Sequence, residues 1–335
     1  MSSKSSDLIP IKSNTRTIRD CFRTCLYEVP SFQRPYSWDL PELKDYWADV
    51  VLAQGDFFFG STVTWESESR ELFNNTYSII DGQQRLTTSS IILSVIRDYF
   101  SQISQIPDSE EAVGPQSQEY MPTNELRSQA ADQAKATQKY LITKDDDGNE
   151  YPVITRTEPN YKEVVQNPSA IPSGSKWNGS AQQIGVARKF FEDEIEKQLK
   201  DLDPAAALQA LKTIRNNVLK ARLIQIELSS EEDGFLIFET LNARGTDLRL
   251  ADLVKNLLVR GGAATSDDRN TIAGRWDRLV DRVQNFNESA SNVDQFIWQS
   301  WNSRRPAVTE ARLYKEILKL VGDIPEKHLE YLEEL

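Results

Sequence analysis

The stretch YSIIDGQQRLTT, residues 77–88, decides how the first part of this 335-residue chain folds. Its first four residues predict a short β-strand, and Asp81-Gly82 predicts the turn that ends the strand. A long helix with an apolar stripe is expected from about Gln84 to Phe100. A strand, a glycine turn and the start of a helix therefore follow one another directly.

This turn has the composition of a phosphate site. Backbone N–H groups at a helix N-terminus carry partial positive charge, and Arg85 adds a planar cation that can bind phosphate oxygens in bidentate fashion. Gln83 and Gln84 are candidates for positioning a water or a base edge, and Asp81 for holding Mg²⁺ or activating water. The alternative is a plain turn in which Asp81 caps the helix and Arg85 forms a surface salt bridge. The chain has no G-x-x-x-x-G-K-[ST] phosphate loop.

A second stretch, VPSFQRPYSW at residues 29–38, combines two prolines with aromatic residues around Gln33 and Arg34. Rigid aromatic rings beside an amide and a guanidinium can stack on bases and grip a nucleic-acid backbone. The alternative is a folded loop whose aromatic side chains, Phe32 and Trp38 among them, enter the core.

A third stretch, FLIFETLNARGTDLRLADLVKN at residues 235–256, predicts a helix, a polar turn and a second helix. The turn contains Asn242 and Arg244, which could face a phosphate or a ribose. Lys255 follows Asp252 by three residues, so the two side chains can pair on one helix face. The alternative is a capped helix-turn-helix with ordinary ion pairs.

The charge of the chain limits how it could contact nucleic acid. The formal net charge is −12, whereas a protein that relies on diffuse attraction to phosphates is normally basic. The first forty residues carry six Lys or Arg against four Asp or Glu, a modest local bias. Any nucleic-acid contact therefore has to come from a local surface.

Cysteine and histidine usage excludes several classes of protein. The two cysteines, Cys21 and Cys25, favour buried thiols in a reducing cytoplasm over a disulfide-stapled secreted fold, with a redox or metal role as the alternative. The start of the chain has no secretory signal, and no membrane span is expected. The one histidine, His328, leaves no imidazoles for a Ser-His-Asp triad, a His-metal nuclease or a zinc finger. We expect His328 to be solvated in an acidic helical tail.

The order of the elements predicts an α+β protein, a small mixed sheet core with helices followed by a mainly helical C-terminal half. Residues 1–101 are expected to form the core with the first two motifs. Residues 102–180 are expected to be a loop-rich insertion with a helix at about 123–139 and a hairpin that turns at Asp147-Gly148. Residues 181–335 form the mainly helical part. A short helix is also expected at 15–24.

The motifs taken in order resemble one family. VPxFQRPYxW, FFFGS, IIDGQQRLTT and FxxLNARGxxLxxADLVKN together resemble the GmrSD-type N-terminal domain, also known as domain of unknown function 262, which is similar to the ParB/sulfiredoxin fold. The resemblance spans roughly residues 15–260 and is weakest in the loops at 102–180. It implies a ParB/sulfiredoxin-like core, nucleotide hydrolysis with GTP favoured, and a role in type IV restriction or a related phage defence.

The resemblance also implies roles for individual residues. The catalytic residues would be Asp81, Gln83, Gln84 and Arg85. The nucleotide-binding residues would be Gly82, Gln33, Arg34, Thr87, Asn242, Arg244 and Lys255. Mg²⁺ is expected at Asp81, and neither zinc nor haem is expected. The layout is similar to effectors of phosphorothioation-based defence, which implies an apolar pocket for a sulfur-bearing DNA backbone, formed by Pro30, Phe32, Tyr36 and Trp38.

The expected partners are phosphorothioated DNA, a nucleotide and a C-terminal HNH-type nuclease domain of the same protein beyond residue 335. The chain alone is not expected to cut DNA or to bind a membrane. Two alternatives remain: a non-catalytic ParB-like module that binds DNA or nucleotide, and a scaffold in which the DGQQR turn only holds the fold together.

Overall fold

The computed structural model describes residues 12–30, 33–53, 55, 57–66, 76–107, 123–158, 161–166, 181–228, 250–263, 265–286, 292–322 and 324–335. The chain divides into two compact units. Unit 1 comprises Met1–Val29 and Pro35–Ser229, and unit 2 comprises Pro30–Arg34 and Ser230–Leu335. Each unit has its own set of secondary-structure elements.

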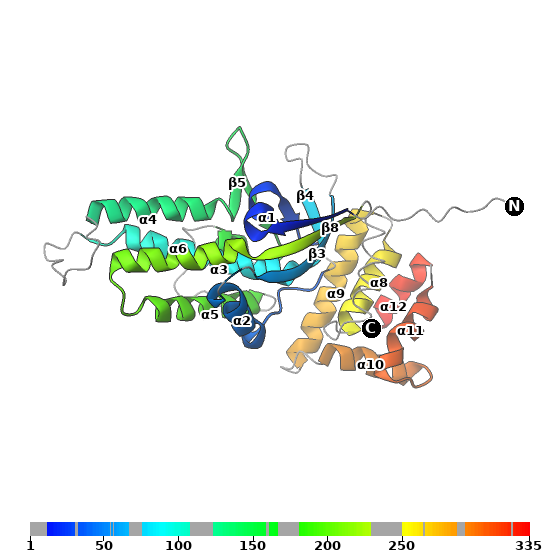
Figure 1. Cartoon of the computed structure of the whole chain (residues 1–335). Coiled ribbons are helices and arrows are strands. Elements are labelled where there is room, and N and C mark those ends of the chain that lie inside the picture. Colours follow the sequence, from blue (N-terminus) through cyan, green and yellow to red (C-terminus); the bar gives the residue numbers. More distant parts are fainter. Residues whose placement is uncertain are drawn as a thin grey trace. The chain divides into compact units, whose positions relative to one another are not determined.

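Unit 1 contains a mixed sheet whose described strands run in the order β1-β8-β3-β4-β2-β7 (Figure 1). These strands are β1 Lys12–Thr17, β2 Leu26–Glu28, β3 Phe58–Glu66, β4 Thr76–Asp81, β7 Ile154–Thr155 and β8 Arg222–Leu228. β3 and β4 form an antiparallel hairpin, β8 runs parallel to β3, and β2 runs parallel to β4. The hairpin predicted at Asp147-Gly148 is present as β5 Ile142–Lys144 and β6 Glu150–Pro152, with Gly148 at a φ of 85° in its turn.

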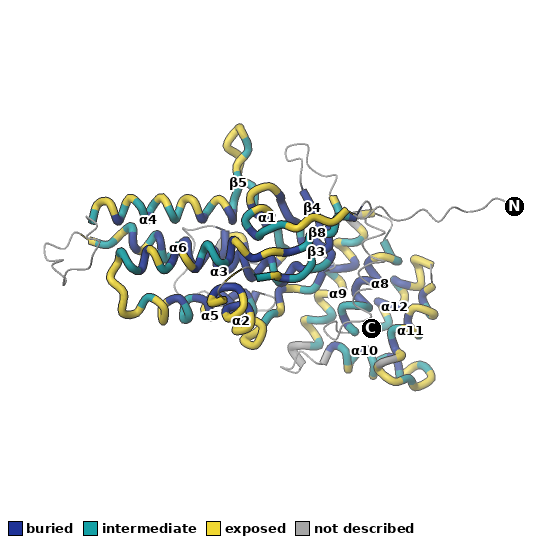
Figure 2. Tube along the Cα trace, viewed as in Figure 1, coloured by how far each residue is buried: buried dark blue, intermediate teal, exposed yellow. Residues whose placement is uncertain are grey.

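The described helices of unit 1 gather around one long central helix. They are α1 Ile18–Thr24, α2 Leu40–Tyr46, α3 Gln83–Ser104, α4 Thr123–Gln138, α5 Gln182–Leu199 and α6 Pro204–Lys220, with π-helices η1 Trp47–Leu52 and η2 Lys162–Gln166. α3 contacts α4, α5 and α6, and most of its side chains are buried. α4 is more exposed, with exposed and half-buried residues interspersed along its length and Leu126, Ala130 and Thr137 buried (Figure 2). The helix at the DGQQR turn is therefore the centre of the unit.

Helix starts in unit 1 follow local capping chemistry. Asp39 and Glu42 form a capping box at the start of α2, and Pro41 lies in the first turn of that helix. Thr17 and Asp20 form a second capping box, so α1 begins at Ile18. The predicted helix at 15–24 is therefore wrong in its first three residues, which are extended because β1 pairs with β8.

Unit 2 is helical in the part that the structure describes. Its helices are α8 Leu250–Gly262, α9 Ser266–Phe286, α10 Asn292–Arg304, α11 Glu310–Val321 and α12 Pro325–Glu334. A further helix predicted at 233–243 lies outside the described residues. The prediction of an α+β protein with a small mixed sheet core and a mainly helical C-terminal half is confirmed. No helix in the described ranges is long and apolar enough to cross a membrane.

The prediction of a solvated His328 is wrong. The imidazole is only 2% exposed, and its Nδ1 atom lies 2.9 Å from the carbonyl oxygen of Ile324. The ring packs on Gly261 of α8, where an added Cβ would come within 1.9 Å of Nε2. The acidic composition of α12 misled the prediction because the helix is amphipathic and buries His328 with Tyr331. The prediction of buried thiols is confirmed for both cysteines.

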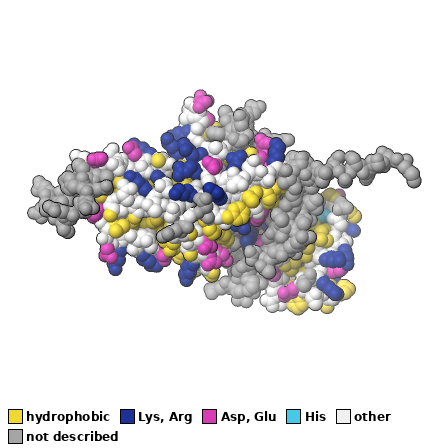
Figure 3. Space-filling view, in the orientation of Figure 1, with side chains coloured by type: hydrophobic (Ala, Val, Ile, Leu, Met, Phe, Trp, Pro, Cys, Tyr) yellow, Lys and Arg dark blue, Asp and Glu magenta, His cyan; other side chains and the backbone are white. Residues whose placement is uncertain are grey.

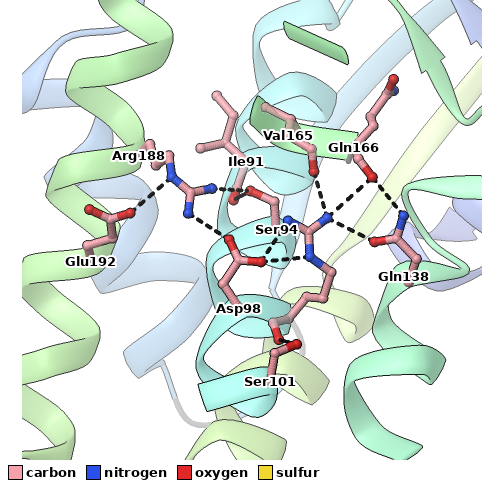
Figure 4. A network of polar contacts seen from close by, with 10 residues as sticks. Ile91, Ser94, Asp98, Ser101, Gln138, Val165, Gln166, Arg188 and Glu192 are labelled. Atoms are coloured by element: carbon pink, nitrogen blue, oxygen red, sulfur yellow. Dashed lines mark hydrogen bonds and ion pairs between the residues drawn. The ribbon is translucent and has the colours of Figure 1, made fainter. Parts of the chain in front are cut away.

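A buried polar network holds α3 against its neighbours (Figure 4). The Asp98 carboxylate pairs with two guanidiniums, with Arg97 Nη2 at 2.8 Å and with Arg188 Nη2 of α5 at 2.6 Å. Arg97 also donates to Gln138 Oε1 of α4 at 2.8 Å and to the Val165 carbonyl of η2 at 3.0 Å. Burial lowers the pKa of Arg97, and the Asp98 charge opposes that effect. One carboxylate on α3 therefore connects three further elements.

We predict that Asp98→Asn lowers the free energy of unfolding by about 3 kcal/mol, because it leaves the buried Arg97 guanidinium without a carboxylate and Arg188 with Glu192 alone. Urea unfolding followed by circular dichroism measures the change. Asp193→Asn is the matched control, since Asp193 pairs with Lys189 at 2.7 Å on the exposed side of α5. Equal losses in the two variants would contradict a special role for the network.

Candidate functional site

The DGQQR turn joins the end of β4 to the start of α3. Gly82 is the N-cap residue of α3, with φ 91° and ψ 3°, a left-handed conformation that favours glycine. A Cβ at this position would lie 2.7 Å from Oγ1 of Thr62 and 3.2 Å from its Cα. The turn therefore needs glycine both for its backbone angle and for the close approach of β3.

The N-terminus of α3 has no side-chain cap. The first N–H groups of a helix have no partner within the helix, and no side chain caps those of α3. The first turn of α3 contains no acidic residue. The alternative in which Asp81 caps the helix does not match this geometry, because the N-cap residue is Gly82.

Asp81 and Arg85 are the half-exposed charged residues of the turn. Their side chains are 37% and 35% exposed, and Arg85 Nη1 lies 3.9 Å from Asp81 Oδ2. Arg85 also donates to the Ser61 carbonyl of β3 at 2.9 Å. An added Cβ at Gly60 would be 3.5 Å from the Arg85 Cζ atom, so the guanidinium lies against the glycine of the FFFGS motif. β3 thus fixes Arg85 while leaving part of it accessible to solvent.

Gln83 and Gln84 are buried, unlike Asp81 and Arg85. Gln84 Nε2 donates to the Pro35 carbonyl at 3.1 Å, and its Oε1 accepts from the Ser37 amide at 2.9 Å. Gln83 Oε1 accepts from Arg156 Nη1 at 3.0 Å. The two amides therefore hold neighbouring chain in place and are already engaged in these bonds.

A buried ion pair between Arg156 and Glu158 lies behind the turn. The two side chains are 0% and 4% exposed, and Arg156 Nε donates to Glu158 Oε2 at 2.9 Å. Arg156 Nη1 also donates to Thr87 Oγ1 at 2.7 Å, while Glu158 Oε1 accepts from the Tyr36 amide at 2.8 Å. Burial alone would raise the pKa of Glu158, but the charge and hydrogen bonds of Arg156 hold that pKa below its usual value.

Hydroxyl groups continue this polar environment along α3. Three successive residues, 88–90, each share a hydrogen bond with a tyrosine hydroxyl. The pairs are Tyr36 with Thr88 at 2.7 Å, Tyr46 with Ser89 at 3.0 Å, and Tyr161 with Ser90 at 3.1 Å. Burial raises the pKa of all three tyrosines, that of Tyr161 to about 12. These tyrosines are therefore neutral structural groups at physiological pH.

The residues predicted to sense DNA fall in different environments. Tyr36 is 1% exposed and belongs to the core, and Trp38 is half-buried with its ring 6.3 Å from that of Tyr46. Pro30 is half-buried, and Phe32 lies outside the described residues. The alternative given for this loop, aromatic residues that enter the core, describes Tyr36 and Trp38 better than direct contact with a ligand.

The other predicted nucleotide-binding residues belong to unit 2. Lys255 Nζ lies 3.5 Å from the Gln33 carbonyl and 2.9 Å from Asp277 Oδ1 on α9. The expected pairing of Lys255 with Asp252 is not formed, because Asp252 lies 4.0 Å from Arg34. Unit 2 thus brings Gln33 and Arg34 next to α8. Two further predicted residues, Asn242 and Arg244, lie outside the described residues.

The described residues offer few side-chain ligands for a metal ion. Within the described residues, no group of three or more His, Cys, Asp or Glu side chains could hold a metal ion. Mg²⁺ is often held by one or two carboxylates with water and substrate phosphates, so Asp81 fits a substrate-bound Mg²⁺ but not a cage made by protein alone.

Arg156 and Glu158 were not predicted from the sequence. They lie in RTE, residues 156–158, within a segment without helical or strand periodicity that was interpreted as loop. One signal was available: an arginine and a glutamate two residues apart, beginning two positions after an apolar pair, Val153-Ile154, which is fully buried. Nothing in the sequence shows that their partners lie on α3.

We predict that Glu158→Gln destabilises the protein by about 3 kcal/mol at neutral pH, because Arg156 would remain buried without a counter-charge. The folded-state pKa of Glu158 is lowered, so its contribution is present above the unfolded pKa and is lost as the pH falls through the folded pKa. Urea unfolding from pH 7 to 3 should therefore show the wild type and the variant converging below about pH 4. A constant difference across this range would contradict the assignment.

We predict that Gly82→Ala costs more stability than Gly148→Ala. Both glycines have a positive φ, 91° and 85°, but an added Cβ meets nothing within 4 Å at Gly148 and meets Thr62 at Gly82. Backbone strain alone should cost about 1 kcal/mol at Gly148, and the collision should raise the cost at Gly82 to about 3 kcal/mol. Thermal unfolding compares the two variants, and equal shifts would show that the approach of Thr62 is unimportant.

The comparisons with known proteins agree with the motif order. Residues 12–259 match the family described as GmrSD restriction endonuclease, N-terminal domain. No curated protein matches the chain significantly. The family match includes the β3–β4 hairpin, the DGQQR turn and Lys255, and it covers more than half of the chain. This chain therefore belongs to the GmrSD restriction endonuclease N-terminal domain family, a domain of restriction effectors.

Proposed function

We propose that this chain is the nucleotide-hydrolysing, DNA-sensing module of a restriction effector, with its phosphate site at the DGQQR turn. One observation carries the proposal: the half-exposed pair of Asp81 and Arg85 lies at the uncapped N-terminus of a long central helix. The rest of the turn is buried, so this pair is where a ligand can reach it.

The physical chemistry of the turn suits the terminal phosphates of a nucleotide. The partial positive charge of the α3 N-terminus and the guanidinium of Arg85 both attract phosphate oxygens. Arg85 is held by the Ser61 carbonyl, so it needs little rearrangement when charge develops on the transferred phosphoryl group. Gly82 has no side chain, which allows Thr62 of β3 to pack against the turn.

Asp81 limits which anions fit. A carboxylate 3.9 Å from the arginine repels a bare phosphate but can hold a Mg²⁺ that arrives with the nucleotide. The ion supplies neutralisation of charge on the phosphates. Asp81 then orients the substrate, and Arg85 binds the phosphoryl oxygens. Gln83 and Gln84 act as positioning residues in this scheme, because their amides are bonded to Arg156 and to the loop at residues 35–37.

The same bonds offer a route for sensing. Gln84 joins the first turn of α3 to the loop at 35–37, so a change in this loop alters the phosphate site. If DNA changes the loop and thereby nucleotide affinity, the nucleotide must change DNA affinity by the same factor. We propose that phosphorothioated DNA is the signal, that GTP is the nucleotide, and that an HNH-type nuclease of the same protein reads the result. These three assignments rest on the family resemblance.

A second candidate is a ParB-like module that binds DNA or nucleotide without turnover. The observation that favours it is the burial of Gln83 and Gln84, since neither amide is placed to align an attacking water. The binding module would release no phosphate from a nucleotide, whereas the proposed hydrolase would.

We predict that Arg85→Ala lowers phosphate release from GTP about 100-fold, because it removes a fixed donor to the transferred phosphoryl group. Asp81→Asn should raise the Mg²⁺ concentration needed for half-maximal turnover. Arg275→Ala is the matched control, since this arginine pairs with Glu333 at the surface of unit 2. The assay measures release from GTP and ATP with plain and phosphorothioated duplexes, after circular dichroism shows equal melting temperatures.

The outcomes separate the candidates. Turnover that is lost in a folded Arg85→Ala variant and raised by phosphorothioated DNA supports the sensing hydrolase. Nucleotide binding without turnover in the wild type supports the binding module. An Arg85→Ala variant that melts while Arg275→Ala does not would assign the turn to holding the fold together.

A further inference from the structure

A basic surface lies on unit 1 over α1, α4 and α6. It consists of five side chains: Arg19, Arg23, Lys139, Lys212 and Arg215. Figure 3 shows Lys and Arg side chains gathered where α1 and the end of α4 lie. The whole chain has a net charge of −12, so this concentration of positive charge is local and contrary to the overall balance.

The contacts of Arg19 and Arg215 bring the three helices together. Arg19 Nη1 on α1 donates to the Tyr140 hydroxyl at 3.3 Å, just after α4. Arg215 Nη1 on α6 donates to Thr137 Oγ1 of α4 at 3.1 Å. One turn earlier on α6, Lys212 Nζ lies 3.4 Å from Gln129 Oε1. Neutral hydroxyl and amide groups thus hold these cations in place.

No carboxylate is paired with these five cations among the residues that the structure describes. Asp20 is the acid next to Arg19, but its carboxylate accepts from the Thr17 amide at 3.1 Å and from the Thr17 hydroxyl at 2.7 Å. Asp132 of α4 pairs with Lys135. The charge of Asp20 interacts with that of Arg19 without forming an ion pair, so the positive charge of the surface is only partly offset within the described structure.

Arg215 lies in an unfavourable environment for a cation. Its guanidinium lies over the Phe100 ring, 5.4 Å from the centroid, and its buried Nε has no hydrogen-bond partner in the described part of the chain. Burial lowers the pKa of Arg215, Tyr140 opposes that effect, and the charge of Arg19 adds to the lowering. Two cations held close together without a counter-charge repel each other, and an anion between them would relieve the repulsion.

We propose that this surface binds the phosphodiester backbone of duplex DNA. Several cations on α1, on α6 and directly after α4 match a line of phosphates better than a single small anion, and the arginines suit phosphate geometry. The assignment to DNA rests on the proposed function of the chain as a DNA-sensing module. The surface is separate from the Asp81–Arg85 pair, so it would supply affinity for DNA and leave basal hydrolysis unchanged.

The test is fluorescence anisotropy of a labelled duplex titrated with the 335-residue chain at several salt concentrations. The variant is Arg19→Gln, Lys139→Gln, Lys212→Gln. It removes one cation from α1, one from the residue after α4 and one from α6. The matched control is Lys189→Gln, Lys197→Gln, Lys319→Gln, which removes the same charge from lysines paired with acids elsewhere. Basal phosphate release and melting temperature are measured for all proteins.

We expect the surface variant to bind DNA at least 10-fold more weakly than the control. The slope of log K against log salt should be shallower by up to about 2.7, because each of three lost phosphate contacts removes about 0.9 from the slope. Equal affinity and slope in variant and control would overturn the proposal, as would a wild type without DNA affinity at low salt or with preference for duplex RNA. If the wild type binds DNA but releases no phosphate from GTP, the result contradicts the proposed hydrolase and not this DNA-binding surface.

Discussion

The buried ion pair between Arg156 and Glu158 is the interaction on which the rest of the candidate site depends. Arg156 bonds Gln83 and Thr87 in the first turn of α3, and Glu158 accepts from the amide of Tyr36. Because both charges are removed from water, each needs the other, and neither segment can move without breaking several bonds. The start of α3 is therefore positioned by residues more than seventy places along the chain.

Polar groups inside unit 1 select one arrangement of the helices. An apolar core tolerates small shifts, whereas a buried hydroxyl or guanidinium has to meet a partner at hydrogen-bond distance. α3 presents residues 88–90 to tyrosines from three other segments, and its Asp98 pairs with Arg97 of the same helix and with Arg188 of α5. These contacts fix the rotation of α3 about its axis and its position along that axis. They therefore also fix the direction in which its N-terminus points. The geometry of the phosphate site is a consequence of packing along the whole helix.

The sequence predicted the elements whose signals are local. The DGQQR turn, α4 and the hairpin at Gly148 follow from glycine positions and from periodicity, and the structure has them. It did not predict that Gln83 and Gln84 would be buried, that Arg156 would lie behind them, or that His328 would pack on Gly261. Each of these facts depends on a partner distant in sequence. A motif shows that a residue matters, but only the partner decides whether it acts on a ligand or holds the fold.

The Asp81–Arg85 pair and the basic surface differ in whether a carboxylate is paired with the arginine. This difference separates their proposed ligands. Arg85 has a carboxylate, Asp81, at 3.9 Å, whereas Arg19 and Arg215 donate hydrogen bonds to neutral hydroxyl groups and form no ion pair in the described structure. An adjacent carboxylate raises the cost of a bare phosphate and favours one that brings a divalent cation. A cluster without a carboxylate favours phosphates that bring no metal of their own, as in a DNA backbone. The position of a single acid therefore directs a nucleotide to one place and DNA to the other in our proposals.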